Sequence, residues 1–564
     1  MKKKIIFLLL CILIIFTVAQ LSASTHHFDS EGFCIQSSQA KVIDLRIEDA
    51  NITLYNNAHK NGTGYSVASG DINNDGTDDF IISTISSIPS IVLPERANVV
   101  QAIFGKSDFP ATTAINLSDI DTVDLTIFWQ HPSSSDFGFS VATGDINGDG
   151  IPDIAMTSRR AVFALYGSEN LRGLINLAVQ DANISIDFNG VSSYFGFSIA
   201  LGDVNGDSFD DLVFSDSQYK EGGDDTGKVY VVYGRGDGNF RLDLLAEGAD
   251  ITIRGERAGN WIGNDLAVED INNDGIEDIL IGARDVEENG EGYIIFGSRD
   301  FPPRHVIKID ANTVTIVGEN PNDRFGNSVA IGDINADGLK EILIGAPKAD
   351  IPGKENIGKA YILDAERIKA GTNDILSLNP VIVVGENAGD HLGNTVSVGD
   401  INADLINDIA IGAAENSDPS NFDSELLKSY LFYGTKEFLN LGRIDLSTQA
   451  ANITILEDNI KCNTPTGMRL SNNNVCGFEP EFLPFAAGDI NADFVNDIIL
   501  GMPSAVPLFM DLGGEGNGYV IYGEGCPCDG LLEIKPGKNQ GELKHGCSPG
   551  TWKIGQRKIG WNQG

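Results

Sequence analysis

One nine-residue pattern of oxygen-bearing side chains recurs seven times along the chain. Asp, Asn and Asp occupy its first, third and fifth positions, and an acid occupies its ninth. The copies are DINNDGTDD (71–79), DINGDGIPD (145–153), DVNGDSFDD (203–211), DINNDGIED (270–278), DINADGLKE (333–341), DINADLIND (400–408) and DINADFVND (489–497). Oxygen ligands at alternate positions of a tight loop suit Ca2+. The seven copies predict a set of calcium loops, and a solvated acidic turn is the alternative for any single copy.

Four side chains and one backbone carbonyl are the expected ligands of each loop. The side chains are those of positions one, three, five and nine, and the carbonyl is that of position seven. The predicted ligand residues are Asp71, Asn73, Asp75, Thr77, Asp79, Asp145, Asn147, Asp149, Ile151, Asp153, Asp203, Asn205, Asp207, Phe209, Asp211, Asp270, Asn272, Asp274, Ile276, Asp278, Asp333, Asn335, Asp337, Leu339, Glu341, Asp400, Asn402, Asp404, Ile406, Asp408, Asp489, Asn491, Asp493, Val495 and Asp497.

The sixth position of each loop needs a sharp turn, which glycine adopts without strain. Four loops have glycine there: Gly76, Gly150, Gly275 and Gly338. Ser208 is a mild departure, whereas Leu405 and Phe494 are larger ones, because backbone strain competes with ligation. Up to seven Ca2+ are expected, and an Asp/Asn turn without metal is the alternative for the loops 400–408 and 489–497.

The chain is strongly acidic, with 80 Asp and Glu against 39 Lys and Arg in 564 residues and a formal charge of −41. The three acids of each loop account for about half of this excess, so much of the charge is concentrated where cations would neutralise it. Polyanions are repelled by such a surface. The composition therefore argues against nucleic acid and anionic membrane as partners.

The N-terminus has the composition of a secretory signal peptide. A basic start precedes an apolar run over 5–18, and small residues at 22–24 offer a cleavage site. We expect a signal peptide at 1–24 and a linker at 25–40, with an uncleaved anchor as the alternative. The mature protein is then secreted or held at the cell surface, without membrane insertion after cleavage.

Export makes disulfides the expected state of the cysteines that follow the signal peptide. They are Cys34, Cys462, Cys476, Cys526, Cys528 and Cys547. We expect a local bridge between Cys462 and Cys476 and a bridge from Cys34 to a cysteine of the tail, although the sequence alone does not settle the pairing. Zinc is the alternative for one group: Cys526, Cys528, His545 and Cys547.

Between 41 and 523 the chain repeats a unit of short β-strands. The first Asp residues of successive loops lie 58 to 89 residues apart, and each unit has four β-branched or aromatic runs broken by Gly, Asn and Asp. FGFSVATGD (137–145) precedes a loop, DILIGA (278–283) follows one, and GKVYVVYG (227–234) and DITIRGE (250–256) are third and fourth strands. Each acidic loop is therefore expected to join a first strand to a second.

Seven such units predict an all-β, seven-bladed β-propeller with one four-stranded sheet per blade. The last unit lacks a fourth strand, and ANITLY at 50–55 matches the fourth strand ANITIL at 451–456. We therefore expect 41–55 to complete the seventh blade and close the ring, which removes an exposed edge. The predicted propeller is 41–523, followed by a Cys- and Gly-rich tail at 524–564.

The order Phe-Gly, Gly-Asp-x-Asn-x-Asp-Gly and Gly-Ala-Pro resembles the FG-GAP repeats of the integrin α-subunit β-propeller. The clearest copies of the first and third elements are Phe137-Gly138, Phe195-Gly196, Phe325-Gly326 and Gly345-Ala346-Pro347. The resemblance covers about 41 to 523 and implies a seven-bladed propeller with calcium loops between first and second strands. Integrin-like subunits have such loops in only some blades, whereas all seven blades qualify here. The resemblance stops at the propeller.

Short motifs give two further indications about function. Arg235, Gly236 and Asp237 spell the Arg-Gly-Asp tripeptide of integrin ligands, on an expected hairpin between a third and a fourth strand. A glycine-rich turn that spells it by chance is the preferred interpretation, because three-residue motifs recur by chance. The chain has no G-x-S-x-G, H-E-x-x-H or nucleotide-binding glycine loop, so we expect no enzymatic activity.

The leading hypothesis is an exported calcium-binding propeller that serves as a binding or adhesion module for an extracellular protein or glycan. We expect the binding loops opposite the calcium loops, with Tyr194, Tyr219 and Trp261 as aromatic anchors. One alternative is a secreted hydrolase, phospholipase-like or glycan-active, on a propeller scaffold. Another is a structural surface protein without a discrete ligand.

Overall fold

The computed structural model describes most of the stretch from 41 to 521 and two short strands before it. The described residues are 27–28, 34–35, 41–44, 51–55, 62–85, 98–110, 113–119, 121–130, 137–180, 182–188, 190, 194–221, 224–236, 238–255, 257, 259–284, 288–402, 404–415, 426–458, 485–492, 496–502 and 517–521. Several predictions lie outside them: the signal peptide, the tail with its zinc alternative, the cysteines from Cys462 onward, and the residues Asp237, Asp493, Phe494 and Val495.

Two compact units make up the chain. Ala40–Glu524 forms one of them. In the other, β1 (His27–Phe28) and β2 (Cys34–Ile35) pair in antiparallel fashion. Nothing in the described part of the chain has the helical length and apolar character that a bilayer crossing requires.

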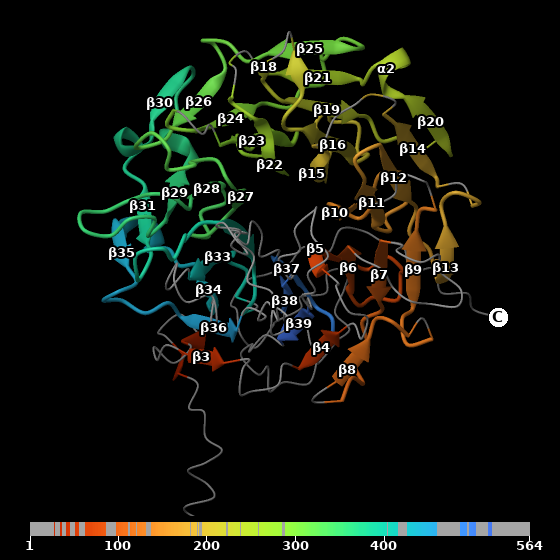
Figure 1. Cartoon of the computed structure of the whole chain (residues 1–564), viewed down its shortest axis with the longest axis horizontal. Coiled ribbons are helices and arrows are strands. Elements are labelled where there is room, and N and C mark those ends of the chain that lie inside the picture. Colours follow the sequence, from red (N-terminus) through yellow and green to blue (C-terminus); the bar gives the residue numbers. More distant parts are fainter. Residues whose placement is uncertain are drawn as a thin grey trace, which may run out of the picture. The chain divides into compact units, whose positions relative to one another are not determined.

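Seven sheets stand around a central axis in the larger unit (Figure 1), so the predicted seven-bladed propeller is confirmed. The strands of a blade, counted from the axis outward, follow the order of each repeat. Blade one has β5 (Gly62–Gly70), β6 (Asp79–Ile85), β7 (Val99–Ile103) and β9 (Leu125–Phe128); blade two has β10 (Val141–Gly144), β11 (Asp153–Thr157), β12 (Ala161–Leu165) and β14 (Ile184–Asp187); and blade three has β15 (Phe195–Gly202), β16 (Asp211–Asp216), β19 (Lys228–Val232) and β21 (Ile251–Arg254). Blade four has β22 (Ile262–Glu269), β23 (Asp278–Ala283), β24 (Glu291–Ile295) and β26 (Val314–Val317), and blade five has β27 (Val329–Gly332), β28 (Glu341–Ala346), β29 (Lys359–Asp364) and β31 (Val381–Val384). Blade six has β32 (Thr395–Gly399), β33 (Asp408–Glu415), β34 (Leu426–Phe432) and β36 (Ile453–Asp458), and blade seven has β37 (Phe485–Gly488), β38 (Asp497–Met502), β39 (Asn517–Ile521) and β4 (Ile52–Tyr55).

Each sheet also has a fifth strand, so the prediction of four strands per blade is wrong. The fifth strand precedes the fourth strand of the next repeat and pairs in parallel with the fourth strand of the blade before it. In blades one to five these strands are β13 (Gly173–Asn176), β20 (Phe240–Asp243), β25 (His305–Lys308), β30 (Thr372–Asp374) and β35 (Arg443–Asp445). Backbone hydrogen bonds therefore tie each of these blades to its neighbour.

Three strands from the N-terminal part close the ring. β4 pairs with β39, with Thr53 opposite Tyr519, so the ANITLY run completes blade seven as predicted. β3 (Lys41–Asp44) instead pairs in parallel with β36 of blade six, which corrects the expectation that all of 41–55 belongs to blade seven. β8 (Thr113–Asn116) is the fifth strand of blade seven.

Neighbouring blades pack through the residues that define the repeat. Phe137, Phe195 and Phe325 are fully buried, each in a separate hydrophobic core. Gly345 of blade five lies so near blade six that a Cβ there would stand 2.0 Å from the carbonyl oxygen of Gly393. The sheets meet at such points without side chains, which explains why glycine recurs there.

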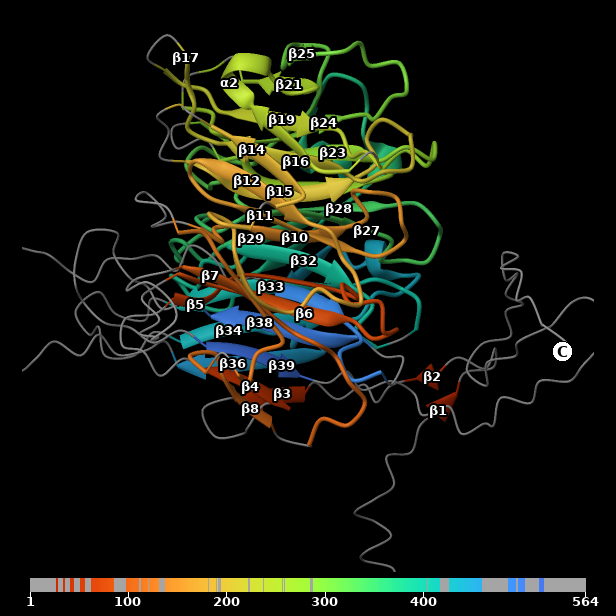
Figure 2. The ribbon, with the colours of Figure 1, turned by 90° about the vertical axis from the view of Figure 1, so that its right-hand side faces the viewer.

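The first strand of each blade runs toward its acidic loop and the second runs back. All seven loops therefore lie at one end of the propeller, and the loops that follow second and fourth strands lie at the other. Figure 2 shows the blades from the side. We call these ends the calcium face and the opposite face.

Candidate calcium sites

The ninth residue of each loop is the first residue of the second strand, and it is buried in all seven blades. Asp79 shows its role. Its carboxylate accepts hydrogen bonds from the backbone N–H groups of Ile72 (3.1 Å), Asn73 (3.3 Å) and Gly105 (2.9 Å) and from Nδ2 of Asn73 (2.9 Å). The second position is a buried aliphatic residue in every loop, such as Ile72. The loop is thus fixed to the core at both of these points.

Positions one and five lie nearer to solvent and hold the tip of the loop. In the second loop the Asp145 carboxylate accepts from the N–H groups of Asp149 (3.0 Å) and Gly150 (2.7 Å), and Asp149 accepts from Ile151 (2.9 Å). The third-position Asn147 donates to Asp153 at 3.2 Å. The side chains predicted as ligands therefore do gather within each fully described loop.

The sixth position has a left-handed backbone whether or not it is glycine. Gly76 has φ of 90°, Ser208 of 72° and Leu405 of 68°. Leu405 keeps the hydrogen bond of a glycine loop, because its N–H donates to Asp400 at 2.8 Å, as that of Gly76 does to Asp71. At its sixth position, loop 400–408 therefore has the same backbone conformation as the glycine loops, at a cost of about 1 kcal/mol or more in backbone strain.

Burial disfavours the ionised form of the acids at the ninth position. It raises the pKa of Asp79 to about 8, and the charges of Asp75 and Asp71 raise it further against the hydrogen bonds that lower it. Burial, assisted by the other acids of the same loop, has the same effect elsewhere. It raises the pKa of the ninth residues to about 7 at Asp153, 9 at Asp211, 6 at Asp278, 8 at Glu341 and 9 at Asp408.

These loops fit Ca2+. Each loop carries three acids and an amide within nine residues, and a divalent cation held by oxygen ligands would relieve the repulsion among the acids, although in the described residues no three acids are already grouped as a metal site. In the seventh loop the described residues include Asp489, Asn491 and Asp497. The Oδ1 atom of Asn491 is buried there and has no hydrogen-bond partner among the described residues, as expected of an oxygen placed for a cation.

Position eight joins the loops of neighbouring blades, a role that the sequence analysis missed. Its N–H donates to the carbonyl of position one in the preceding blade, and its side chain accepts the N–H of that same residue. The four pairs, with the two distances in that order, are Asp78 with Asp489 (3.1 and 3.0 Å), Asp210 with Asp145 (3.0 and 2.7 Å), Glu277 with Asp203 (3.1 and 2.9 Å), and Asn407 with Asp333 (2.9 and 3.0 Å). The available signal was an Asp, Glu or Asn at position eight in five of the seven copies.

The comparisons with known proteins agree with this geometry. The FG-GAP repeat family matches residues 137–167, 195–232 and 325–363. The chain contains FG-GAP repeats. Repeats of this family typically bind Ca2+, and the acidic loops are arranged consistently with that property.

Curated relatives of this FG-GAP repeat protein fall into two groups. Bovine phosphatidylinositol-glycan-specific phospholipase D is 25% identical over 382 residues, which are 62% of this chain and 43% of that protein. Integrin alpha pat-2 of Caenorhabditis briggsae is 31% identical over 235 residues, 38% of this chain and 18% of that protein. Mouse integrin alpha-8 is 32% identical over 187 residues, 30% of this chain and 15% of that protein. The chain thus spans less than half the length of these relatives.

Among solved structures, the Vibrio cholerae biofilm matrix protein Bap1 aligns with 84% of this chain and 90% of its own. Its TM-score is 0.32 and its sequence identity is 10%.

The Arg-Gly-Asp tripeptide of the FG-GAP propeller has its arginine engaged within the protein. The Arg235 guanidinium lies 4.4 Å from the ring centroid of Phe240 and 3.4 Å from Oδ2 of Asp250. A partner that recognises this tripeptide would have to compete with both contacts.

The predicted aromatic anchors also have contacts. Tyr194 lies 5.8 Å from Phe197, the Arg284 guanidinium lies over Trp261 at 5.4 Å, and the Lys228 ammonium lies over Tyr219 at 3.4 Å.

Proposed function

We propose that this protein is an exported, calcium-stabilised propeller that binds an extracellular protein or glycan and serves in adhesion. The proposal rests on a structural difference between the calcium face and the opposite face. On the calcium face, acidic loops are bonded to one another across blade boundaries, so this face supports the ring. The loops that follow the second and fourth strands lie at the opposite face, away from these bonds, and serve recognition.

The relatives support the same direction. Two of them are integrin alpha chains by name, and they match 38% and 30% of this chain. The full-length chain in Ca2+ buffer should bind members of an array of extracellular matrix proteins and glycans, and binding should be lost in chelator. A chain that stays folded with Ca2+ and binds no member of either array would contradict the proposal.

A secreted hydrolase is the second candidate, because bovine phosphatidylinositol-glycan-specific phospholipase D matches 62% of this chain. The shared region covers 43% of that relative. Incubation of the purified protein with glycosylphosphatidylinositol, phospholipid and polysaccharide substrates separates the two proposals. The control is a mock preparation, purified in the same way from cells that do not express the protein. Turnover above that of the control would favour the hydrolase.

A further inference from the structure

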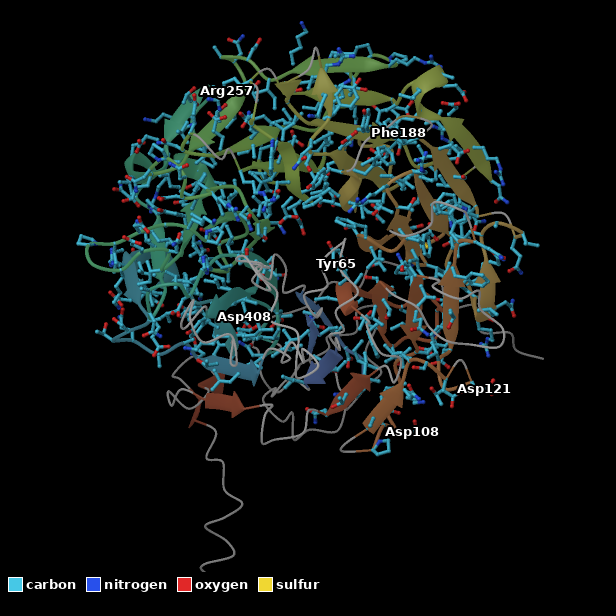
Figure 3. The ribbon with its side chains drawn as sticks, viewed as in Figure 1. Tyr65, Asp108, Asp121, Phe188, Arg257 and Asp408 are labelled. Atoms are coloured by element: carbon cyan, nitrogen blue, oxygen red, sulfur yellow. The ribbon has the colours of Figure 1, made fainter. Side chains whose placement is uncertain are left out.

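A cavity of about 290 Å³ lies at the centre of the propeller, among the starts of the first strands. We call it the central cavity. At one equivalent position, blades one to three contribute Tyr65, Phe139 and Phe197, whereas blades four and five contribute Asn264 and Asn327. Figure 3 shows Tyr65 beside the centre of the ring. The central cavity therefore has an aromatic wall and an amide wall.

The aromatic wall is continuous. The ring centroids of Tyr65 and Phe139 are 4.9 Å apart and those of Phe139 and Phe197 are 5.3 Å apart, with interplanar angles of 54° and 46°. Tilted rings in mutual contact form a curved apolar surface whose side chains hold one another in place.

The amide wall is fixed by its own hydrogen bonds. Nδ2 of Asn264 donates to the carbonyl of Asn327 at 2.7 Å, and Nδ2 of Asn327 donates to the carbonyl of Asn394 at 2.8 Å. Oδ1 of Asn327 accepts from Arg284 at 3.1 Å. Asn264 is 2% exposed, yet its Oδ1 has no hydrogen-bond partner among the described residues. A buried acceptor without a partner is costly unless a ligand or water supplies a donor.

Asp265 adds a carboxyl group to the lining, where blades one to three and five have serine. Its carboxylate accepts from the hydroxyls of Ser198 (3.3 Å) and Ser328 (2.8 Å) and from the N–H groups of Val329 (2.9 Å) and Leu266 (3.0 Å). All four donors are neutral, so no cation pairs with this carboxyl group among them.

We infer that the central cavity binds one neutral pyranose unit of a glycan, stacked on the aromatic wall and hydrogen-bonded to the amide wall. This inference rests on the proposed binding function and names its ligand class and site. A pyranose has an apolar C–H face that suits aromatic rings and an edge of hydroxyls that can donate to Oδ1 of Asn264. Few convergent polar groups beside apolar ones are the usual composition of a small-molecule site.

Size and charge select among ligand classes. The volume stands at the lower limit of ligand cavities, roughly 300 Å³, which suits one sugar ring rather than a folded peptide segment. The Asp265 carboxyl has four neutral donors and no cationic one, so it offers sialic and uronic acids no positive charge to bind. Two lysines of the opposite face have acidic partners: Lys359 pairs with Glu319 at 2.6 Å and Lys428 with Glu386 at 2.9 Å.

Saturation-transfer NMR on the full-length chain in Ca2+ buffer tests the inference. The probes are free galactose, glucose, mannose, fucose, N-acetylglucosamine and N-acetylgalactosamine, with N-acetylneuraminic and glucuronic acids as anionic arms. At least one neutral sugar should bind. Its affinity should fall about fivefold in Phe139→Ala, which removes the middle of the aromatic wall, because such contacts contribute about 1 kcal/mol. Phe296→Ala is the matched control and should keep the affinity, because Phe296 is half-exposed and lies at the calcium-face end of β24.

A second variant distinguishes loss of the binding site from misfolding. Thr395→Trp fills the central cavity without removing a wall, and it should abolish sugar binding while the melting temperature stays near that of the wild type. Binding of only the anionic sugars, binding unchanged in both cavity variants, or binding of no sugar would each overturn the inference. In those cases the array experiment still decides the proposed function, because a protein partner or a glycan bound elsewhere would leave adhesion intact.

Discussion

Asp145 and Asp210 are joined by two reciprocal hydrogen bonds across the boundary between blades two and three. The N–H of Asp145 donates to the Asp210 carboxylate at 2.7 Å, and the N–H of Asp210 donates to the Asp145 carbonyl at 3.0 Å. Asp145 is also the first predicted ligand of its calcium loop. Calcium binding and blade packing therefore depend on the same residue.

Removal of the Asp210 side chain should destabilise the propeller. Asp210→Ala leaves the half-buried N–H of Asp145 without its acceptor, which costs about 1–3 kcal/mol. Asp210→Asn is the matched control, because Asn407 accepts the corresponding bond from Asp333 at 3.0 Å. Urea unfolding in excess Ca2+ should show a lower midpoint for the alanine variant than for the asparagine variant. Equal midpoints would mean that this contact contributes no stability.

Calcium should stabilise the folded chain. Each occupied site adds about 2.7 kcal/mol when free Ca2+ exceeds its Kd a hundredfold, if the unfolded chain does not bind. The melting temperature should fall in chelator and recover with Ca2+, but less with Mg2+, which demands tighter octahedral geometry. No change on chelation would refute this prediction.

A single loop can be tested by stoichiometry. Asp149→Ala removes the exposed fifth-position ligand of the second loop and should lower bound Ca2+ by one ion per chain, measured by equilibrium dialysis with elemental analysis. Asp121→Ala removes an exposed acid outside the loops (Figure 3) and should leave the count unchanged. An equal loss in both variants would indicate diffuse binding to an acidic surface.

The limits of sequence reasoning can be seen in particular residues. Ligand spacing identified Asp79 and its equivalents because one loop contains the whole pattern. Asp210 was missed because its partner, Asp145, lies 65 residues earlier in a different repeat. The fifth strands were missed because they are only three or four residues long, and their pairing depends on where the next blade stands. Closure of blade seven by Ile52–Tyr55 was predictable because it repeats a recognisable strand.

Substitution of Gly345 should test the close approach of blades five and six. Its new Cβ would stand 2.0 Å from the Gly393 carbonyl oxygen, so Gly345→Ala should cost about 1–3 kcal/mol or more through overpacking. Gly338→Ala is the comparison, because φ there is 85° but nothing lies within 4 Å of the new Cβ. We expect about 1 kcal/mol for it, from backbone strain alone. A larger loss for Gly338→Ala would mean that loop strain, not blade contact, limits stability.

Asp265 should make the propeller less stable as pH rises. Burial raises its pKa from the usual 3.8, against the hydrogen bonds from Val329, Ser328, Leu266 and Ser198 that lower it. Below pH 3.8 both the folded and the unfolded chain hold the proton. Between 3.8 and the folded pKa, only the folded chain holds it, so stability falls through this window and stays lower above it.

Asp265→Ser isolates this effect from the other acids of the chain, because Ser328 accepts the N–H of Val396 in the way that Asp265 accepts that of Val329. The hydrogen bonds lost with the carboxylate lower stability by an amount independent of pH. The difference in melting temperature, variant minus wild type, should therefore become more positive as pH rises above about 4. Differential scanning calorimetry at fixed Ca2+ measures it. A difference that is constant, or that becomes more negative as pH rises, would show that Asp265 is ionised in the folded chain without penalty.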